Sequence, residues 1–217
     1  MAIIVVGGSA RGAGKTSLVC GLIAALPDFR WTAIKITSHD HSKRTPVWEE
    51  MQPGEETDTA RYLTAGAARA FLVTASGGDP ISEADLTLAL DELWPNFGRG
   101  TNLIFESNSV VHHVRANVCF MIHAVPQREL PLPERKPSFI AAVGHADAMV
   151  ALAGADGVTP ERLRLPGQEP KPIFHLKDFG KLSPQMLDWL RPRLGSALLD
   201  PVGPNPARSD SAPGDSA

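Results

Sequence analysis

The sequence lacks the features that mark several large classes of protein. No apolar run in its 217 residues is long enough to span a membrane, and no internal repeat is visible. The N-terminus leads directly into an apolar segment, without the basic start or the cleavage site of a signal peptide. The net charge is −3 and the lysines and arginines are scattered, so there is no basic patch for nucleic acid. We therefore expect a cytoplasmic protein that binds neither membranes nor nucleic acids.

Cysteine is also scarce, with only Cys20 and Cys119 in the chain. One lies in a predicted helix and the other in a predicted strand, which favours core thiols over a disulfide or a metal pair. The length suits one α/β domain with a large core, which we expect to span residues 1–199. Residues 200–217 are rich in Pro, Ser, Asp, Gly and Ala, and we predict a disordered tail there.

A strand, a glycine-rich loop and a helix are predicted in the first 26 residues. Ile3 to Val6 form a continuous apolar run that ends at Gly7 and Gly8, as in a strand buried on both faces of a parallel sheet. After the loop, apolar residues return at helical spacing. They are Leu18, Leu22, Ile23 and Leu26.

The loop has the composition that phosphate binding requires. Its glycines let backbone N–H groups face a polyphosphate, and the next helix adds unpaired donors and the positive end of its dipole. Lys15 is predicted to reach the β and γ phosphates, and Thr16 to bind magnesium. The spacing is G-x5-G-K-T, one residue longer than the standard motif, with Ser9 in place of its first glycine. The predicted nucleotide-binding residues are Gly12, Ala13, Gly14, Lys15, Thr16 and Ser17.

Strands and helices are predicted to alternate along the rest of the chain. Trp31 to Thr37 is an apolar strand that contains Lys35, whereas residues 38–56 are polar, lack periodicity and are predicted to form a long functional loop. A short helix begins at Thr57, and Phe71 to Thr74 form the next strand.

The second half continues this alternation. Ser82 is a suitable cap for a helix that runs to Leu93, with Pro95 as its stop. Leu103 to Phe105 form a strand that ends in Glu106. The remaining predictions are a strand at Val118–Ile122, a loop at residues 126–137, a strand at either Phe139–Val143 or Met149–Leu152, a short apolar segment at Ile173–Leu176 and a last helix at Pro184–Leu194.

The predicted fold is therefore a P-loop α/β domain, with a mainly parallel central sheet and helices on both faces. Ligands of such sheets bind at the carboxyl ends of the strands. The phosphate loop, the segment Lys35 to His41 and the segment Glu106 to Asn108 all lie at those ends, so we expect them to form one site.

Two acidic residues are the candidate partners of the magnesium ion. Glu106 ends an apolar strand, the position at which nucleotide hydrolases place a magnesium carboxylate. Asp40 lies in the long loop and is predicted to bind magnesium or its water shell. His39 and His41 flank it, but residues two apart in an extended segment point to opposite sides and do not easily share one metal ion.

Other polar residues leave alternatives open. The helix that begins near Asp58 and Arg61 could face the site, or it could carry only an ordinary acidic first turn. His112 and His113 have no ligand spacing and are predicted to lie on the surface. The segment HLKDF, residues 175–179, approaches the guanine-reading motif N-K-x-D with the wrong spacing, so the choice between ATP and GTP stays open.

Three stretches together resemble the MobB family, the adaptor proteins of molybdopterin-guanine dinucleotide biosynthesis. They are GGSARGAGKTS, AIKITSHDH and PGEETDTARYLTAGAARAFLV, in the family's order. Two positions depart from the family pattern. Ser107, Asn108 and Ser109 follow Glu106 where the family has glycine and an aromatic residue, and the longer loop near Ser9 is similar to that of dethiobiotin synthetase.

The resemblance implies a homodimer that binds GTP or ATP with Mg²⁺ and hydrolyses it slowly in molybdenum-cofactor maturation. Its partner would be a nucleotidyltransferase or another molybdoenzyme-maturation protein. The alternatives are an ATP-dependent small-molecule kinase or ligase of the dethiobiotin synthetase type, which Lys35 also suits, and a binding module without hydrolysis. The residues expected to act in catalysis are Lys15, Lys35, Asp40 and Glu106, and those expected at the metal are Thr16, Asp40 and Glu106.

Overall fold

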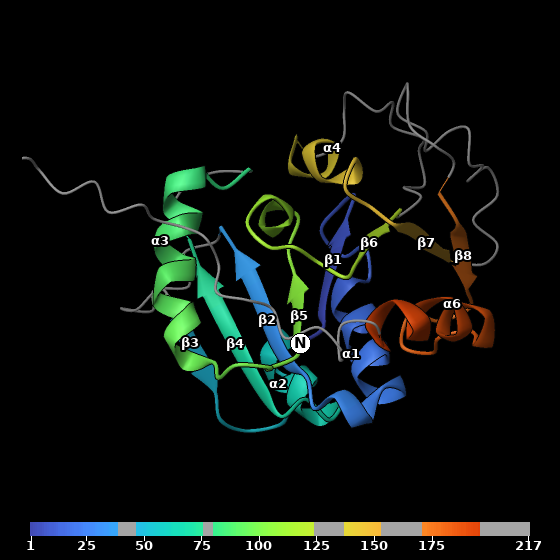
Figure 1. Ribbon diagram of the computed structural model, residues 1–217, viewed down its shortest axis with the longest axis horizontal. Helices are drawn as coiled ribbons and strands as arrows, with labels where there is room; N and C mark the ends of the chain where they lie inside the picture. Colours follow the sequence, from blue (N-terminus) through green and yellow to red (C-terminus); the bar gives the residue numbers. More distant parts are fainter. Residues whose placement is uncertain (39–46, 76–79, 124–136, 153–170, 196–217) are drawn as a thin grey trace, which may run out of the picture.

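An eight-stranded sheet forms the centre of the computed structural model (Figure 1). The structure describes residues 1–38, 47–75, 80–123, 137–152 and 171–195. The strand order is β3-β4-β2-β5-β1-β6-β7-β8, and every neighbouring pair is parallel except β3 and β4. The strands are β1 (Ile3–Gly8), β2 (Thr32–Thr37), β3 (Val47–Glu50), β4 (Arg69–Thr74), β5 (Leu103–Glu106), β6 (Val118–Ile122), β7 (Ala148–Leu152) and β8 (Ile173–Leu176).

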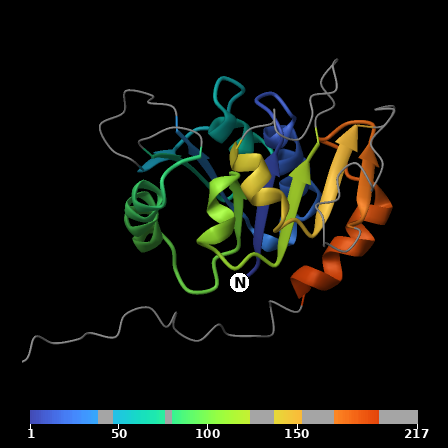
Figure 2. The same ribbon diagram turned by 90° about the horizontal axis from the view of Figure 1, so that it is seen from above.

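Helices cover both faces of this sheet (Figures 1 and 2). One face packs against α1 (Lys15–Ala25), α2 (Asp58–Thr64) and α6 (Pro184–Gly195), and the other against α3 (Glu83–Leu93) and α4 (Pro137–Val143). Three short 3₁₀ helices lie at Pro27–Phe29, Trp94–Asn96 and Ser109–His112. The predicted fold class, an α/β fold with a mainly parallel sheet, is confirmed.

The side chains of β1 divide between the two cores. Ile4 and Val6 pack into the core on the α1 side, and Ile3 and Val5 into the core on the α3 side. Successive side chains of a strand point to opposite faces, so a strand buried on both faces must be apolar at every position. This explains why the strand appears in the sequence as an unbroken apolar run.

The register of the central strands sets the position of the site. Glu106 of β5 lies level with Val6 of β1 on one side and with Lys35 of β2 on the other. All three strands run in the same direction, so their carboxyl ends open on the same edge of the sheet. The loop between β1 and α1 lies at this edge.

One prediction about secondary structure was wrong, and one open alternative is resolved. The polar stretch predicted as loop contains β3, an edge strand that pairs antiparallel with β4. Its four residues are too few for a periodic pattern, and the pairing depends on a neighbour that is distant in the sequence. Phe139 to Val143 lie in the helix α4, and the strand is the alternative segment, within β7. Phe139, Ala142 and Val143 are buried at helical spacing, so the pattern for a helix was present.

The other predicted elements are confirmed within a residue or two at their ends. Cys20 and Cys119 are free thiols, as predicted. Burial raises the pKa of Cys20 to about 11 and that of Cys119 to about 12, so both thiols stay protonated at neutral pH. The predicted tail and most of the predicted loop at residues 126–137 lie outside the described residues. In the part of the chain that is described, no helix is long and apolar enough to cross a membrane.

Candidate functional site

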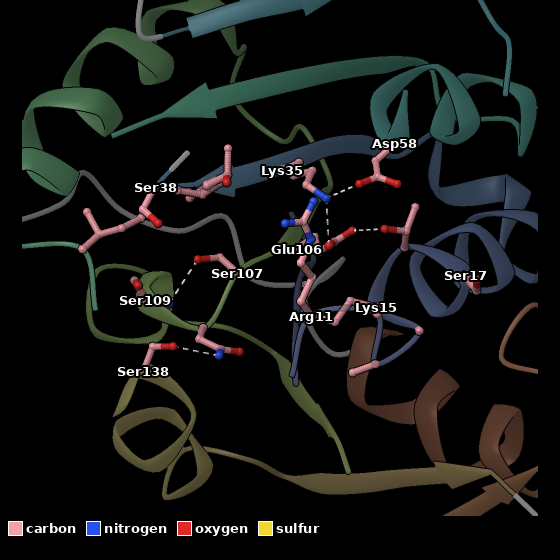
Figure 3. A pocket seen from close by; sticks show the side chains of 18 of the residues that line it. Arg11, Lys15, Ser17, Lys35, Ser38, Asp58, Glu106, Ser107, Ser109 and Ser138 are labelled. Carbon is pink, nitrogen blue, oxygen red and sulfur yellow. Dashed lines mark hydrogen bonds and ion pairs between the residues drawn. The ribbon is translucent and has the colours of Figure 1, made fainter. Parts of the chain in front are cut away.

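A cavity of about 530 Å³ opens at the carboxyl ends of β1, β2 and β5 (Figure 3). Its lining comes from the phosphate loop, from the ends of β2 and β5, from the first turn of α2, from the segment after β5, and from Ile81 and Ser138. The volume is in the range of pockets that hold small ligands. The predicted residues that line it are Gly12, Ala13, Gly14, Lys15, Thr16, Ser17, Lys35 and Glu106.

The phosphate loop depends on two glycines with positive φ. Gly12 has φ 74° and Gly14 has φ 91°, a region that residues with a Cβ rarely adopt. Gly14 is the N-cap of α1, so the unpaired N–H groups of the first turn begin directly after it. Lys15 folds back over the loop, where its Nζ donates to the carbonyl oxygen of Ala10 at 3.2 Å. Together these features form the anion-binding cradle predicted from the sequence.

Glu106 connects the first turn of α1 to the second strand. The side chain is only 4% exposed. Its Oε2 accepts a hydrogen bond from Thr16 Oγ1 at 2.8 Å and another from the hydroxyl of Tyr62, which is fully buried. Its Oε1 lies 3.2 Å from Lys35 Nζ. Glu106 is therefore a buried carboxylate with partners on both oxygens, not an exposed acid at a strand end.

The ammonium group of Lys35 lies between two carboxylates. It forms ion pairs with Glu106 and with Asp58, the first residue of α2 (Figure 3). Burial lowers the pKa of Lys35, but the charges of Glu106 and Asp58 raise it, and the net pKa is above its ordinary value. This arrangement explains how a lysine is accommodated inside an apolar strand. The cation emerges at the end of the sheet among acidic partners.

Asp58 belongs to the site, which resolves the alternative that the sequence left open. The Thr57 side chain caps α2 by accepting from the N–H of Ala60 at 3.0 Å, and Asp58 follows in the first turn. Burial raises the pKa of Asp58. The hydrogen bond from Lys35 and the charge of Lys35 lower the pKa by more than burial raises it, so the net pKa is below its ordinary value. The carboxylate is therefore ionised at neutral pH.

The pKa of Asp58 predicts a change of stability with pH. A carboxylate with a lowered pKa in the folded state contributes stability above its unfolded pKa, and the contribution is lost as the pH falls through the folded value. At pH values above 3.8, the ordinary pKa of an aspartate, we therefore expect the free energy of unfolding of wild type to exceed that of Asp58→Asn. Below that pH the difference should shrink. Since the side chain is 34% exposed, we expect no more than about 1 kcal/mol. Urea unfolding at a series of pH values measures this difference.

Asp91→Asn is a matched control, because Asp91 lies exposed on α3. Its free energy of unfolding should follow that of wild type over the same pH range. The same pH-dependent gap in both variants would contradict a specific contribution from Asp58.

Tyr62 and Arg11 were not predicted to belong to the site, whereas Arg61 was left as an open alternative and Asn108 belongs to a segment that was predicted there. Tyr62 and Arg61 share α2 with Asp58, and Tyr62 lies one helical turn after Asp58, a spacing that places both side chains on one face of a helix. That spacing was the available signal. Arg11 lines the cavity from within the phosphate loop, and Asn108 from the segment after Glu106. For Arg11 and Asn108, the only signal in the sequence was that each lies in a segment predicted to reach the site.

The two histidines that were predicted to lie on the surface do not line this cavity. His112 is exposed and His113 half-buried, as predicted, and the His112 ring packs edge-on against that of His145, with the centroids 4.6 Å apart. Asp40, His39 and His41 lie outside the described residues. The segment HLKDF lies beside the phosphate loop, since a Cβ on Gly14 would stand 2.1 Å from the ring of Phe179.

The oxygen donors of the site fit a magnesium ion. Mg²⁺ in nucleotide sites is held by one or two carboxylates, by substrate phosphates and by water. The Thr16 hydroxyl and the Glu106 carboxylate are already together at 2.8 Å, next to the phosphate loop. Among the residues that the structure describes, no group of three or more His, Cys, Asp or Glu could hold a metal ion. The pair of Thr16 and Glu106 therefore suits an ion that arrives with a phosphate ligand.

Comparisons with known proteins identify the fold but not the family. No protein-family model matches the chain, and no curated protein sequence matches it. HypB from Helicobacter pylori, solved in complex with nickel, is similar with a TM-score of 0.56 and 16% identity, over 89% of this chain and 87% of that chain. LpxK from Aquifex aeolicus, solved in complex with ATP, gives a TM-score of 0.46 and 18% identity, over 80% of this chain and 53% of the LpxK chain. This chain thus spans about half the length of LpxK. At this identity, the likeness to HypB shows a shared fold, and the predicted P-loop α/β fold is confirmed.

Proposed function

We propose that this protein binds a nucleoside triphosphate together with Mg²⁺ and hydrolyses it slowly. The observation that carries the proposal is the 2.8 Å hydrogen bond between Thr16 and Glu106 beside the phosphate loop. A hydroxyl at the start of α1 and a buried carboxylate at the end of β5 are the two protein groups that a nucleotide-bound magnesium ion requires. Both lie in the cavity that the loop and Lys15 also line.

The residues around the phosphate loop and Glu106 each have a role in this proposal. The backbone N–H groups of Gly12 to Thr16 and the ammonium of Lys15 hold the phosphates. Thr16 and Glu106 hold the magnesium ion, which when bound neutralises charge on the β and γ phosphates. Tyr62 fixes Glu106 by donating to its Oε2. Lys35 is the cation available to the γ phosphate from the second strand.

Asp40 remains part of the proposal as a ligand of the water shell that helps to place the attacking water. Reactions of this kind depend on positioning and on charge stabilisation, so weak turnover is expected without a partner group. The choice between ATP and GTP is not decided by any described residue of the site.

The biological role that we propose is similar to that of MobB proteins, in molybdenum-cofactor maturation. Support comes from the three sequence stretches that resemble the family, which supply Lys15, Lys35 and Asp58 in that order. In this role the protein acts in the cytoplasm as a homodimer, and its partner is a nucleotidyltransferase or another maturation protein.

A second candidate is an ATP-dependent small-molecule kinase or ligase of the dethiobiotin synthetase type. Ser107, Asn108 and Ser109 favour it, since they line the cavity with polar groups where the MobB pattern has glycine and an aromatic residue. Strong stimulation of nucleotide consumption by one metabolite indicates this candidate, whereas stimulation by a partner protein indicates the adaptor. Tight nucleotide binding without any release of phosphate indicates a binding module.

Replacing Glu106 by glutamine tests the proposed hydrolysis. Glutamine keeps the size of the side chain and removes the charge that would hold magnesium, so we expect phosphate release to fall by about 100-fold or more. Phosphate release from Mg-ATP and from Mg-GTP is measured for both proteins. Urea unfolding is measured in parallel, because the loss of the ion pair with Lys35 also affects stability.

Glu92→Gln is a suitable control, since Glu92 is exposed on α3. It should hydrolyse nucleotide at the wild-type rate. Equal rates of phosphate release in folded Glu106→Gln and in wild type would show that the assignment of Glu106 is wrong.

A further inference from the structure

The cavity has a second end whose chemistry differs from that of the phosphate loop. In Figure 3, Ser38, Ser107, Ser109 and Ser138 lie toward one side of the cavity, and the charged cluster around Lys35 lies toward the other. We call this second region the hydroxyl end. Its hydroxyl and amide side chains are Thr37, Ser38, Ser107, Asn108, Ser109 and Ser138.

Asn108 holds the hydroxyl end in a fixed position relative to the phosphate loop. Its Oδ1 accepts from the N–H of Gly8 at 2.8 Å, and its Nδ2 donates to the carbonyl oxygen of Gly8 at 3.1 Å. The same Nδ2 donates to Ser138 Oγ at 3.0 Å. The two donated bonds use both hydrogens of the amide nitrogen, and the three bonds together tie α4 to the last residue of β1. Ser138 is therefore placed by the strand that leads into the loop.

Ser107 and Ser138 are buried side chains that still line the cavity, at 4% and 5% exposure. The oxygen of Ser107 accepts from the N–H groups of Ser109 at 3.1 Å and of Val110 at 3.3 Å. The oxygen of Ser138 accepts from Asn108. A serine hydroxyl has one hydrogen to donate, and in the described part of the chain these bonds leave that hydrogen available in both residues. The hydroxyl end therefore offers donors, which suit a ligand with oxygen acceptors.

The hydroxyl end carries no charged side chain among its described residues. Ile36, which is buried, and Ile81, which is partly buried, also line the cavity. An ionic ligand would lose its hydration here without a counter-charge, which is unfavourable. A neutral ligand with hydroxyl groups and carbon–hydrogen surfaces matches both the donors and the apolar contacts.

We propose that the hydroxyl end binds a small uncharged polyhydroxylated molecule, a polyol or a monosaccharide, beside the phosphate loop. The inference deepens the proposed function, on which it rests for the nucleotide that would occupy the neighbouring end of the cavity. The site itself is formed by residues that are already in place in the described structure. Its binding can therefore be measured with and without nucleotide.

Saturation-transfer NMR on the full chain tests the proposal with four probes: glycerol, erythritol, glucose and myo-inositol. Each probe is measured alone and with Mg²⁺ and a non-hydrolysable ATP analogue. We expect at least one probe to bind wild type and Ser138→Ala to bind it about tenfold more weakly, the effect of one buried hydrogen bond. Thr87→Ala is the matched control, because Thr87 is exposed on α3, and its affinity for the probe should equal that of wild type.

Thermal unfolding confirms that each variant is folded, and Ser107→Ala replaces Ser138→Ala in the comparison if the latter does not fold. Binding by none of the four probes, or equal affinity in the cavity variant and in Thr87→Ala, overturns the proposal. The two proposals fail in different ways. Analogue binding without probe binding rejects only the hydroxyl end, whereas probe binding without analogue binding rejects the nucleotide assignment.

Discussion

Lys15→Ala is expected to abolish nucleotide binding while leaving the protein folded. The ammonium is the one fixed positive charge that the loop motif directs at the β and γ phosphates, and charge-assisted hydrogen bonds contribute about 1.5–3 kcal/mol each. Loss of two such bonds weakens binding by at least about 100-fold. The fold should persist, because alanine is favourable in a helix and the bond that the Lys15 ammonium donates to the carbonyl oxygen of Ala10 lies within the loop itself. Titration calorimetry with Mg-ATP and Mg-GTP measures the change in affinity.

Lys181→Ala provides the control for a general loss of positive charge. Lys181 is exposed and lies between β8 and α6. Its removal should leave nucleotide affinity unchanged. If the titration of Lys15→Ala matches that of wild type, the phosphate loop does not bind nucleotide in the manner proposed. Undiminished unfolding temperature in Lys15→Ala would show that any loss of binding reflects the missing ammonium.

The central part of the site could be predicted because its residues stand at the ends of strongly apolar strands. The runs that form β1, β2 and β5 are buried, and their length and composition are visible in the sequence. The rule that ligands bind at the carboxyl ends of parallel strands then brings Thr16, Lys35 and Glu106 together. The register adds what the rule cannot give, which is that Lys35 and Glu106 are direct neighbours.

The contacts of α2 could not be predicted in the same way. Asp58 reaches Lys35, and Tyr62 reaches Glu106, only because the helix packs against the sheet at one particular rotation. The sequence of α2 predicts a helix and an acidic first turn, but it does not say which end of which strand the turn faces. The position depends on packing between segments that are distant along the chain, as does the pairing of β3 with β4.

The same limit applies to Asn108. A polar residue after a strand is compatible with a ligand contact, a turn or a surface loop. Its actual bonds are to the backbone of Gly8, 100 residues earlier, and to Ser138 on α4. A single sequence shows that Asn108 follows a strand, whereas the parallel pairing of β5 with β1 determines that its amide meets the start of the phosphate loop.

Gly14→Ala is expected to be the most destabilising single-methyl change in the phosphate loop. Gly14 has φ 91°, and a residue with a Cβ in the left-handed region loses about 1–2 kcal/mol. The added Cβ would also stand 2.1 Å from Cδ2 and 2.4 Å from Cε2 of Phe179, a buried ring. Overpacking of this kind costs about 1–3 kcal/mol, so the free energy of unfolding should fall by about 2–5 kcal/mol. That is a large part of the stability of an ordinary domain. Urea unfolding measures it.

Gly12→Ala separates the two causes of destabilisation in Gly14→Ala, which are the positive φ and the contact with the ring of Phe179. Gly12 also has a positive φ, of 74°, but nothing lies within 4 Å of the place where its Cβ would be. The free energy of unfolding of Gly12→Ala should therefore fall only by the cost of the left-handed backbone conformation, about 1–2 kcal/mol. In a protein that already carries Phe179→Ala, Gly14→Ala should lower the free energy of unfolding by no more than Gly12→Ala does, because the ring that meets the new methyl group is gone. Equal losses for Gly12→Ala and Gly14→Ala in the wild-type background would show that Phe179 moves aside freely, and that the segment after β8 does not restrain the phosphate loop.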